Sequence, residues 1–262
     1  KMKSEYNTIL YTQNDGVTTI TLNRSESYNA FTAEMRSELL QALQTASADT
    51  ACRVIVLTGA GKAFCSGQDL KDIAGVKVDF NDFLKNGYNP IILAMRNMPK
   101  PIVGRINGVA AGAGCSLALA CDYCVADERA SLVEVFVGIG LVLDSGSSYF
   151  LPKLVGSNKA FELATMGTKV SASQAVSWGM INKAVPSEEL DDAILQVTNY
   201  YANAPTKAIG MIKKMLNDSG NKTLEEVLDY EAYYQDIAGN SSDYAEGVNA
   251  FLEKRKPVFK GQ

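Results

Sequence analysis

Gly108-Val109-Ala110-Ala111-Gly112-Ala113-Gly114-Cys115 is the most constraining stretch of the chain, and an apolar segment that reads as a helix follows it. A backbone with so few bulky side chains lets a ligand approach its N–H groups closely. The first N–H groups of a helix also lack partners within the helix. We therefore expect residues 112–114 to offer backbone donors to a ligand, although close packing of the helix would explain the same small residues.

A single carboxylate follows further along, where Asp144 lies inside the apolar run Gly138-Ile-Gly-Leu-Val-Leu-Asp-Ser-Gly146. An acid in apolar surroundings has a raised pKa and can carry a proton. Backbone donors that face one acid/base residue suit chemistry beside a carbonyl group. The alternative is that Asp144 only caps a helix that begins at Ser145.

Composition limits the chemistry that this chain can perform. It has 262 residues, 47% of them hydrophobic and 21% charged, which is typical of a globular protein. The net charge of −4 argues against a general nucleic-acid surface. The chain has no histidine, which excludes Ser-His-Asp and Cys-His catalysis and argues against a metal site. Acid/base work falls to Asp, Glu, Tyr, Lys or Cys.

Five cysteines form an odd set, which predicts reduced thiols and a cytoplasmic location. Cys121 and Cys124 form a CxxC pair, but they lie in a strand-like run and are expected to be buried small residues. No apolar run is long enough for a membrane span and no signal-peptide core begins the chain, so we expect no membrane association.

Strands alternate with helices up to Pro152, which indicates an α/β portion. Helices dominate the rest of the chain. We expect an α/β core over residues 1–200 and a helical region over residues 201–262. The predicted strands are 18–22, 54–58, 102–106, 123–126 and 181–185, and the predicted helices are 32–48, 82–97, 112–120, 158–167, 171–178, 187–204, 206–217, 224–239 and 241–254.

Glycine pairs at 59–61, 112–114 and 138–140 do not complete a nucleotide-binding motif. The first lacks the leading glycine and the Ser/Thr of a P-loop, and the other two lack the third glycine of GxGxxG.

Five ordered blocks resemble the crotonase family, the enoyl-CoA hydratase/isomerase superfamily. They are Gly61-Lys-Ala-Phe-Cys-Ser-Gly-Gln-Asp-Leu-Lys71, the segment 100–115, Gly140-Leu-Val-Leu-Asp-Ser-Gly146, the segment 171–181 and the segment 243–255. The resemblance implies a crotonase-like spiral of ββα units followed by a helical C-terminal trimerisation region. It also implies an acyl-CoA thioester as ligand, with coenzyme A as part of the substrate and no other cofactor, and a homotrimer or a dimer of trimers.

The resemblance assigns roles to several residues. It implies that the N–H groups of Gln68 and Ala113 form an oxyanion hole for the thioester oxygen, where one donor is worth roughly 2.7–4 kcal/mol in the transition state. Lys254 and Phe251 would reach coenzyme A across a subunit contact, although a solvated basic tail is the simpler interpretation. The expected substrate-binding residues are Ala63, Ser66, Asp69, Leu70, Lys71, Gly112, Ser116, Phe136, Phe251 and Lys254.

The chain departs from the family's hydratases at both catalytic glutamate positions, which are Ser116 and Phe136 here. Water addition by two glutamates is therefore not expected. Glu134 lies nearby, on the side of Phe136 if the strand alternates, and we expect a solvated or paired carboxylate there rather than a catalytic one.

Asp144 matches the single aspartate of family members that shift double bonds. The likeness is strongest to the isomerases of ring-1,2-epoxyphenylacetyl-CoA in phenylacetate breakdown. The resemblance thus implies an isomerase in which Asp144 is the acid/base residue. A hydratase or thioester hydrolase that uses Asp144 alone is the first alternative, and a non-catalytic acyl-CoA-binding protein is the second.

Overall fold

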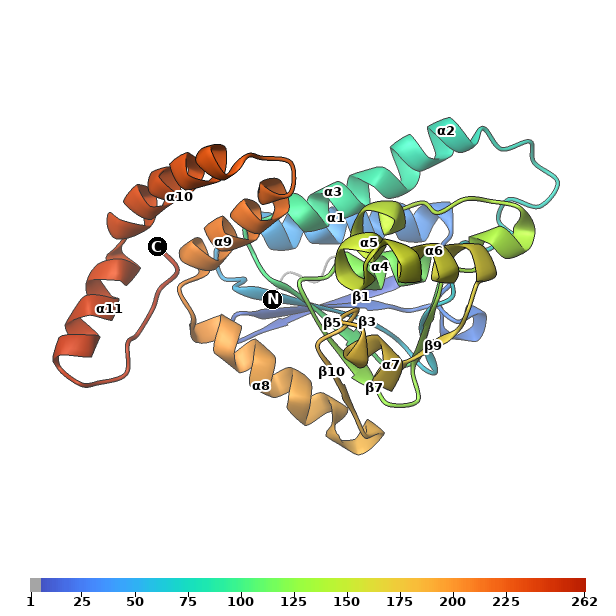
Figure 1. The fold of residues 1–262 in the computed structure, drawn as a ribbon. Coiled ribbons are helices and arrows are strands. Elements are labelled where there is room, and N and C mark those ends of the chain that lie inside the picture. Colours follow the sequence, from blue (N-terminus) through green and yellow to red (C-terminus); the bar gives the residue numbers. More distant parts are fainter. Residues whose placement is uncertain (1–5) are drawn as a thin grey trace.

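The computed structural model describes residues 6–262, which form two β-sheets with helices packed around them (Figure 1). The larger sheet has the strand order β1-β2-β3-β5-β7-β10, and only β1 is antiparallel to its neighbour. Its strands are β1 (Ile9–Asn14), β2 (Val17–Leu22), β3 (Val54–Gly59), β5 (Ile102–Ile106), β7 (Tyr123–Asp127) and β10 (Lys183–Val185).

The smaller sheet has the order β4-β6-β8-β9, with β4, β6 and β8 parallel and β9 antiparallel to β8. Its strands are β4 (Ala63–Cys65), β6 (Val109–Ala111), β8 (Ser131–Val133) and β9 (Val170–Ser171). Two strands and then a helix follow one another along the chain four times; the first unit gives both strands to the larger sheet, and each of the other three gives one strand to each sheet. The repeated ββα order that the family resemblance implies is confirmed.

The helices follow the predicted ones closely, apart from α5, which was not predicted. A π-helical turn (Leu84–Tyr88) joins α2 to α3. The helices are α1 (Ala33–Ala48), α2 (Phe80–Phe83), α3 (Asn89–Asn97), α4 (Ala113–Leu119), α5 (Ser147–Val155), α6 (Ser157–Met166), α7 (Ala172–Ser177), α8 (Leu190–Asn203), α9 (Thr206–Ser219), α10 (Leu224–Gly239) and α11 (Ser242–Leu252).

The central strand β3 is buried along its whole length, so its side chains build a core on both faces of the larger sheet. Ile55 and Leu57 pack into the main core, which also holds residues of α1, α3 and α4. Val54 and Val56 point to the other face, where they pack beside Leu190 and Ile194 of α8. Continuous apolar runs of this kind are typical of parallel strands covered on both sides.

Side chains fix where several helices begin. The Thr32 hydroxyl accepts a hydrogen bond from the Met35 N–H at the start of α1. Ser171 with Gln174 and Thr223 with Glu226 form capping boxes at the starts of α7 and α10. Each such cap contributes about 1 kcal/mol because it satisfies backbone donors that the helix leaves free.

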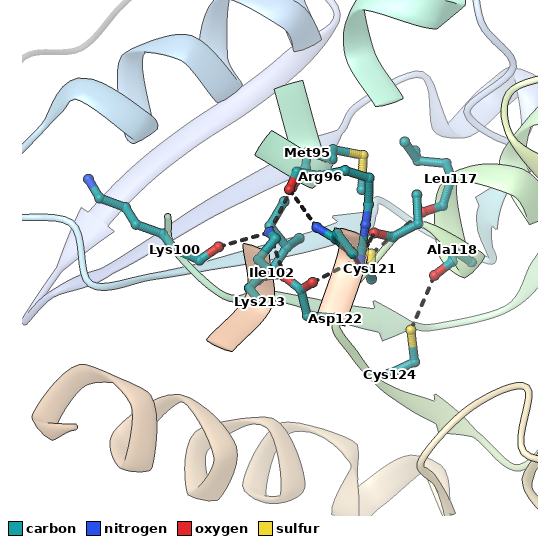
Figure 2. Close-up of polar contacts among 12 residues, drawn as sticks. Met95, Arg96, Lys100, Ile102, Leu117, Ala118, Cys121, Asp122, Cys124 and Lys213 are labelled. Carbon is teal, nitrogen blue, oxygen red and sulfur yellow. Dashed lines mark hydrogen bonds and ion pairs between the residues drawn. The ribbon is translucent and has the colours of Figure 1, made fainter. Parts of the chain in front are cut away.

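A buried ionic cluster attaches α9 to the α/β core (Figure 2). Lys213 Nζ lies 2.7 Å from Asp122 Oδ2 and donates to the Met95 carbonyl at 2.7 Å. Arg96 Nη1 binds the other oxygen of Asp122 at 2.9 Å. Because Lys213 is 7% exposed, this pairing is what makes its burial tolerable.

The CxxC cysteines lie beside the same cluster as free thiols (Figure 2). Cys121 donates to the Leu117 carbonyl and Cys124 to the Ala118 carbonyl, both in α4. The two thiols thus satisfy carbonyls at the C-terminal end of this helix, in keeping with the expectation of packed small residues.

α10 and α11 lie to one side of the α/β core, followed by the C-terminus (Figure 1). The separation into residues 1–200 and 201–262 stays a prediction, and α8 runs across its boundary. Within residues 6–262, no helix has both the length and the apolar character needed to cross a bilayer.

Candidate active site

A cavity of about 310 Å³ opens at the carboxyl ends of the small parallel strands. Gln68, Ala113 and Phe136 follow β4, β6 and β8, so they lie at one edge of the smaller sheet, where ligands of parallel sheets commonly bind. The lining residues are Ser66, Gly67, Gln68, Leu70, Ile73, Phe80, Phe83, Leu84, Tyr88, Gly112, Ala113, Val135, Phe136, Gly138, Ile139, Leu141 and Asp144.

Glycines bring two backbone segments together at this edge. Gly112 has φ +52° and lies between β6 and α4, which begins at Ala113. Gly67 has φ +93°, and a Cβ there would lie 2.9 Å from the Ala111 carbonyl oxygen and 3.5 Å from the Ala113 nitrogen. A side chain at Gly67 is therefore excluded both by backbone conformation and by space.

The N–H groups of Gln68 and Ala113 make no hydrogen bond within residues 6–262. Ala113 is the first residue of α4, and the first N–H groups of a helix have no intrahelical partner. Both residues line the cavity. The two predicted oxyanion donors are thus brought to one cavity, although their role stays a prediction.

The side chain of Gln68 is held by three hydrogen bonds. Its Oε1 accepts from Arg36 Nη1 and from the Tyr88 hydroxyl, both at 2.7 Å, and its Nε2 donates to the Asp69 carbonyl at 3.0 Å. The Arg36 guanidinium packs over the rings of Phe83 and Tyr88, with 4.4 and 5.0 Å to the centroids. These contacts fix the residue that carries one of the two N–H groups.

Arg36 was not singled out from the sequence. It is 7% exposed on the buried side of α1, between the buried residues Met35 and Leu39. A charged residue on the apolar stripe of a helix is the signal that could have revealed it, since such a residue needs a buried partner.

Asp144 begins a tight turn whose next two residues have positive φ, +51° at Ser145 and +88° at Gly146. The Ser147 N–H donates to the Asp144 carbonyl at 3.0 Å and closes the turn. A Cβ at Gly146 would lie 2.6 Å from the ring of Phe150. The turn therefore requires glycine at this position.

The Asp144 carboxyl lines the cavity and is half-buried. Burial raises its pKa, and the Ser145 hydroxyl, which donates to Asp144 Oδ1 at 2.7 Å, opposes that rise. The alternative that Asp144 caps a helix is wrong, because α5 begins at Ser147 and its N-cap is Gly146, with no side-chain cap. Its carboxylate remains available to a ligand.

The two positions that hold glutamates in family hydratases carry no acid. Phe136 is 7% exposed and lines the cavity. Ser116 is fully buried in α4, where its hydroxyl donates to the Asp144 carbonyl at 3.1 Å and lies 2.7 Å from Ser147 Oγ. Ser116 thus contacts the backbone of the Asp144 turn instead of the cavity.

Glu134 was expected to be a solvated or paired carboxylate on the side of Phe136, and the structure contradicts both the solvation and the side. Glu134 is 2% exposed, and Ser147 Oγ lies 2.8 Å from its Oε1. The strand ends at Val133 and Val135 has a helical conformation, so side chains no longer alternate there. Glu134 consequently turns away from the cavity, toward α4 and α5.

The other predicted substrate-binding residues are divided by the structure. Ser66, Leu70 and Gly112 line the cavity, but Ala63, Asp69 and Lys71 do not. Ala63 is buried in β4, and Asp69 pairs with Arg24 at 3.0 Å. Lys71 is exposed on the loop that follows.

Phe251 and Lys254 lie far along the chain, at the end of α11 and just beyond it, and both are exposed. Phe251 lies on an apolar surface shared with α9 and α10 rather than in the cavity. The expectation that these two residues reach coenzyme A across a subunit contact stays a prediction.

Comparison with known proteins agrees with this architecture. Residues 12–262 match the family model described as "Enoyl-CoA hydratase/isomerase". A 1,2-epoxyphenylacetyl-CoA isomerase of Escherichia coli is 42% identical, over 94% of this chain and 96% of its own. A "Probable enoyl-CoA hydratase" of Rhodobacter capsulatus is 40% identical, over 98% and 99%.

Among solved structures, an enoyl-CoA hydratase of Bacillus anthracis has a TM-score of 0.93 at 30% identity, and the match covers 98% of this chain and all of that one. The match of fold and the match of sequence thus both extend over nearly the whole chain. The chain belongs to the enoyl-CoA hydratase/isomerase family and has its crotonase fold.

Proposed function

We propose that this protein is an acyl-CoA isomerase that moves a double bond, or opens a ring epoxide, next to a CoA thioester. The observation that carries the proposal is that Asp144 is the only acid among the described residues that line the cavity. Two backbone N–H groups that have no partner within residues 6–262, those of Gln68 and Ala113, lie at the same cavity.

In the proposed reaction the thioester oxygen binds both N–H groups, which acidifies the neighbouring carbon. The Asp144 carboxylate removes a proton from the α- or γ-carbon, and the electron pair moves onto the thioester oxygen as a dienolate. The resulting carboxylic acid then returns the proton to the other carbon. Nothing is added to or lost from the substrate, so one proton carrier is enough.

The missing glutamates favour this reaction over hydration. Water addition requires a group that holds and activates water, and the two positions that supply it in family hydratases are Ser116 and Phe136. Phe136 fills its part of the cavity with an apolar ring, which disfavours an ordered water there. The name of the Escherichia coli relative, an isomerase, supports the same choice.

The ligand is expected to enter as a whole acyl-CoA, with no separate cofactor. Apolar and aromatic residues of the lining, among them Phe80, Phe83 and Phe136, suit an apolar acyl group. We propose in addition that the protein is a cytoplasmic homotrimer or a dimer of trimers, with α9–α11 as the assembly region and Lys254 and Phe251 placed against coenzyme A.

The first alternative is a hydratase or a thioester hydrolase in which Asp144 alone activates water. It is favoured by the hydratase name of the second relative. A non-catalytic acyl-CoA-binding protein is the second alternative, and the intact Asp144 weakens it.

Product analysis separates these activities. The purified protein is incubated with a 3-enoyl-CoA and, separately, with crotonyl-CoA, and the products are measured by chromatography and mass spectrometry. Isomerisation leaves the mass unchanged, hydration adds one water, and hydrolysis releases free coenzyme A. We expect migration of the double bond to be faster than hydration. Efficient hydration with slow migration would reverse the ranking, and binding without turnover would favour the non-catalytic alternative.

A further inference from the structure

Glu134 is a buried acid near the cavity, and the proposed mechanism does not use it. It is 2% exposed, and its Oε2 has no hydrogen-bond partner among the described residues. An isolated ionised carboxylate is costly to bury, so such a group stays neutral unless a cation compensates it. No ion pair to Glu134 exists within residues 6–262.

A row of hydroxyl groups connects Glu134 to the backbone of Asp144. Glu134 Oε1 lies 2.8 Å from Ser147 Oγ, which lies 2.7 Å from Ser116 Oγ. The Ser116 hydroxyl in turn lies 3.1 Å from the Asp144 carbonyl, its nearer acceptor, and 3.3 Å from the Gly112 carbonyl. The acid therefore reaches the turn that presents the Asp144 carboxylate, although it does not touch the cavity.

The proton of Glu134 decides the direction of these hydrogen bonds. A neutral carboxylic acid can donate to Ser147, which then donates to Ser116, and Ser116 donates to the Asp144 carbonyl. When Glu134 is ionised it can only accept, so Ser147 must donate to it and Ser116 receives no hydrogen bond from Ser147. Ser116 can then turn its own proton toward Ser147, which withdraws it from Asp144.

We propose that Glu134 is a positioning residue, held as a neutral carboxylic acid, that orients the Ser147 and Ser116 hydroxyls and so fixes the turn carrying the catalytic carboxylate. The inference rests on the proposed function of Asp144. It adds a second acid to the site that does not contact the substrate and that acts only through the hydroxyls of α4 and α5.

The surroundings of Glu134 agree with a neutral acid. Its titratable neighbours are the Cys115 thiol on α4 and Asp144, while α5 offers the neutral Ser147. Burial raises the pKa of Glu134 to about 7, the Ser147 hydrogen bond and the neighbouring Cys115 thiol oppose that rise, and the charge of Asp144 adds to it. Ionisation above neutral pH would place a second negative charge behind Asp144 and oppose the developing enolate.

The test compares the pH dependence of isomerase turnover for the wild type, Glu134→Gln and Glu134→Leu. The wild type is expected to lose turnover on the alkaline side, as Glu134 ionises. The glutamine cannot ionise and can still donate to Ser147, so this variant should keep its turnover at high pH. The leucine cannot donate, and its turnover should fall roughly 10–100-fold at all pH values because the turn is misplaced, with KM little changed.

Glu128→Gln is the matched control, since Glu128 is exposed on the turn after β7 and its side chain makes no hydrogen bond to another described residue. It should leave the profile unchanged. A Glu134→Gln profile that coincides with the wild type overturns the proposal, as does a Glu134→Leu variant with normal turnover. If Glu134→Leu does not fold, Ser147→Ala breaks the same row of hydroxyls and should lower kcat similarly.

A spectroscopic measurement separates this inference from the proposed function. The infrared band of a protonated carboxylic acid is recorded for the wild type and Glu134→Gln below and above neutral pH. We expect a band that disappears in the variant and weakens in the wild type as the pH rises. This result requires no turnover, so it stands even if the isomerase assay fails, and the absence of the band at low pH would overturn the inference by itself.

Discussion

Two groups of lining residues, which we call the two walls of the cavity, serve the proposed reaction in different ways. On one wall, Gln68 and Ala113 offer backbone N–H groups, and the side chains matter only through the space they leave. On the other wall, the Asp144 turn offers a single side chain whose chemistry cannot be replaced. Turnover should therefore be sensitive to shape and backbone conformation at the first wall, and to the identity of one residue at the second.

The largest effect is expected from Asp144→Asn, which keeps the shape of the side chain but removes the proton carrier. Isomerase turnover should fall by about 10²–10⁴-fold, while acyl-CoA affinity changes little. Steady-state kinetics and a binding measurement on the same preparation check both expectations. Turnover near the wild-type value would show that the reaction does not need the Asp144 carboxylate, and the proposed mechanism would fail.

Ala113→Val tests the first wall. The added methyl groups crowd the thioester and should lower turnover by roughly 10–100-fold, while circular dichroism shows a folded protein. Ala113→Gly is the matched control, because it keeps the N–H group and removes bulk, and it should lose much less activity. Equal losses in both variants would mean that the backbone donor is not what matters at this position.

A crystal structure with bound acyl-CoA would test both walls at once. The thioester oxygen should lie about 2.7–3.1 Å from the Gln68 and Ala113 nitrogens, with an Asp144 oxygen near the reacting carbons. A thioester bound elsewhere would leave residues 112–114 with a packing role only.

Sequence patterns revealed most of the larger sheet and most helices, because their periodicity extends over several residues. β4, β6, β8 and β9 were not predicted, since strands of two or three residues are too short to show alternation. These short strands are nevertheless the ones whose ends build the cavity. Residues 112–114 and Asp144 stand out from local sequence chemistry, whereas Gln68 could be named only because the family's motifs mark it.

Long-range contacts explain what the sequence could not show about the site. Arg36 lies thirty-two positions from Gln68, and no local pattern predicts that its guanidinium binds that side chain. Glu134 was placed on the wrong side because a change of backbone conformation at Val135 ends the strand alternation. Both side chains are buried polar groups whose partners come from other elements.

Arg36→Met tests whether the hydrogen bonds that hold the Gln68 side chain contribute to the first wall. The variant keeps a long side chain against Phe83 and Tyr88 but leaves Gln68 Oε1 with only the Tyr88 hydroxyl. Turnover should fall by about tenfold, because a hydrogen bond to a charged group contributes about 1.5–3 kcal/mol. Tyr88→Phe removes the other donor and should have a smaller effect, since that donor is neutral. A kcat unchanged in both variants would show that the hydrogen bonds of Arg36 and Tyr88 to Gln68 do not contribute to turnover.

The smallest effect concerns Ser145, whose hydroxyl donates to Asp144 Oδ1 and favours its ionised form. Ser145→Gly deletes the hydroxyl, and glycine accepts the positive φ of this position without strain. The pKa of Asp144 should then rise further, because burial is no longer opposed. Asp144 must be ionised to remove a proton, so the acidic limb of the pH–rate profile should move to higher pH.

The plateau rate should stay within about tenfold of the wild type, because the carboxylate itself remains. An acidic limb that does not move would mean that Asp144 is not the group whose ionisation controls turnover. The second wall could then no longer be described as acting through the Asp144 carboxylate.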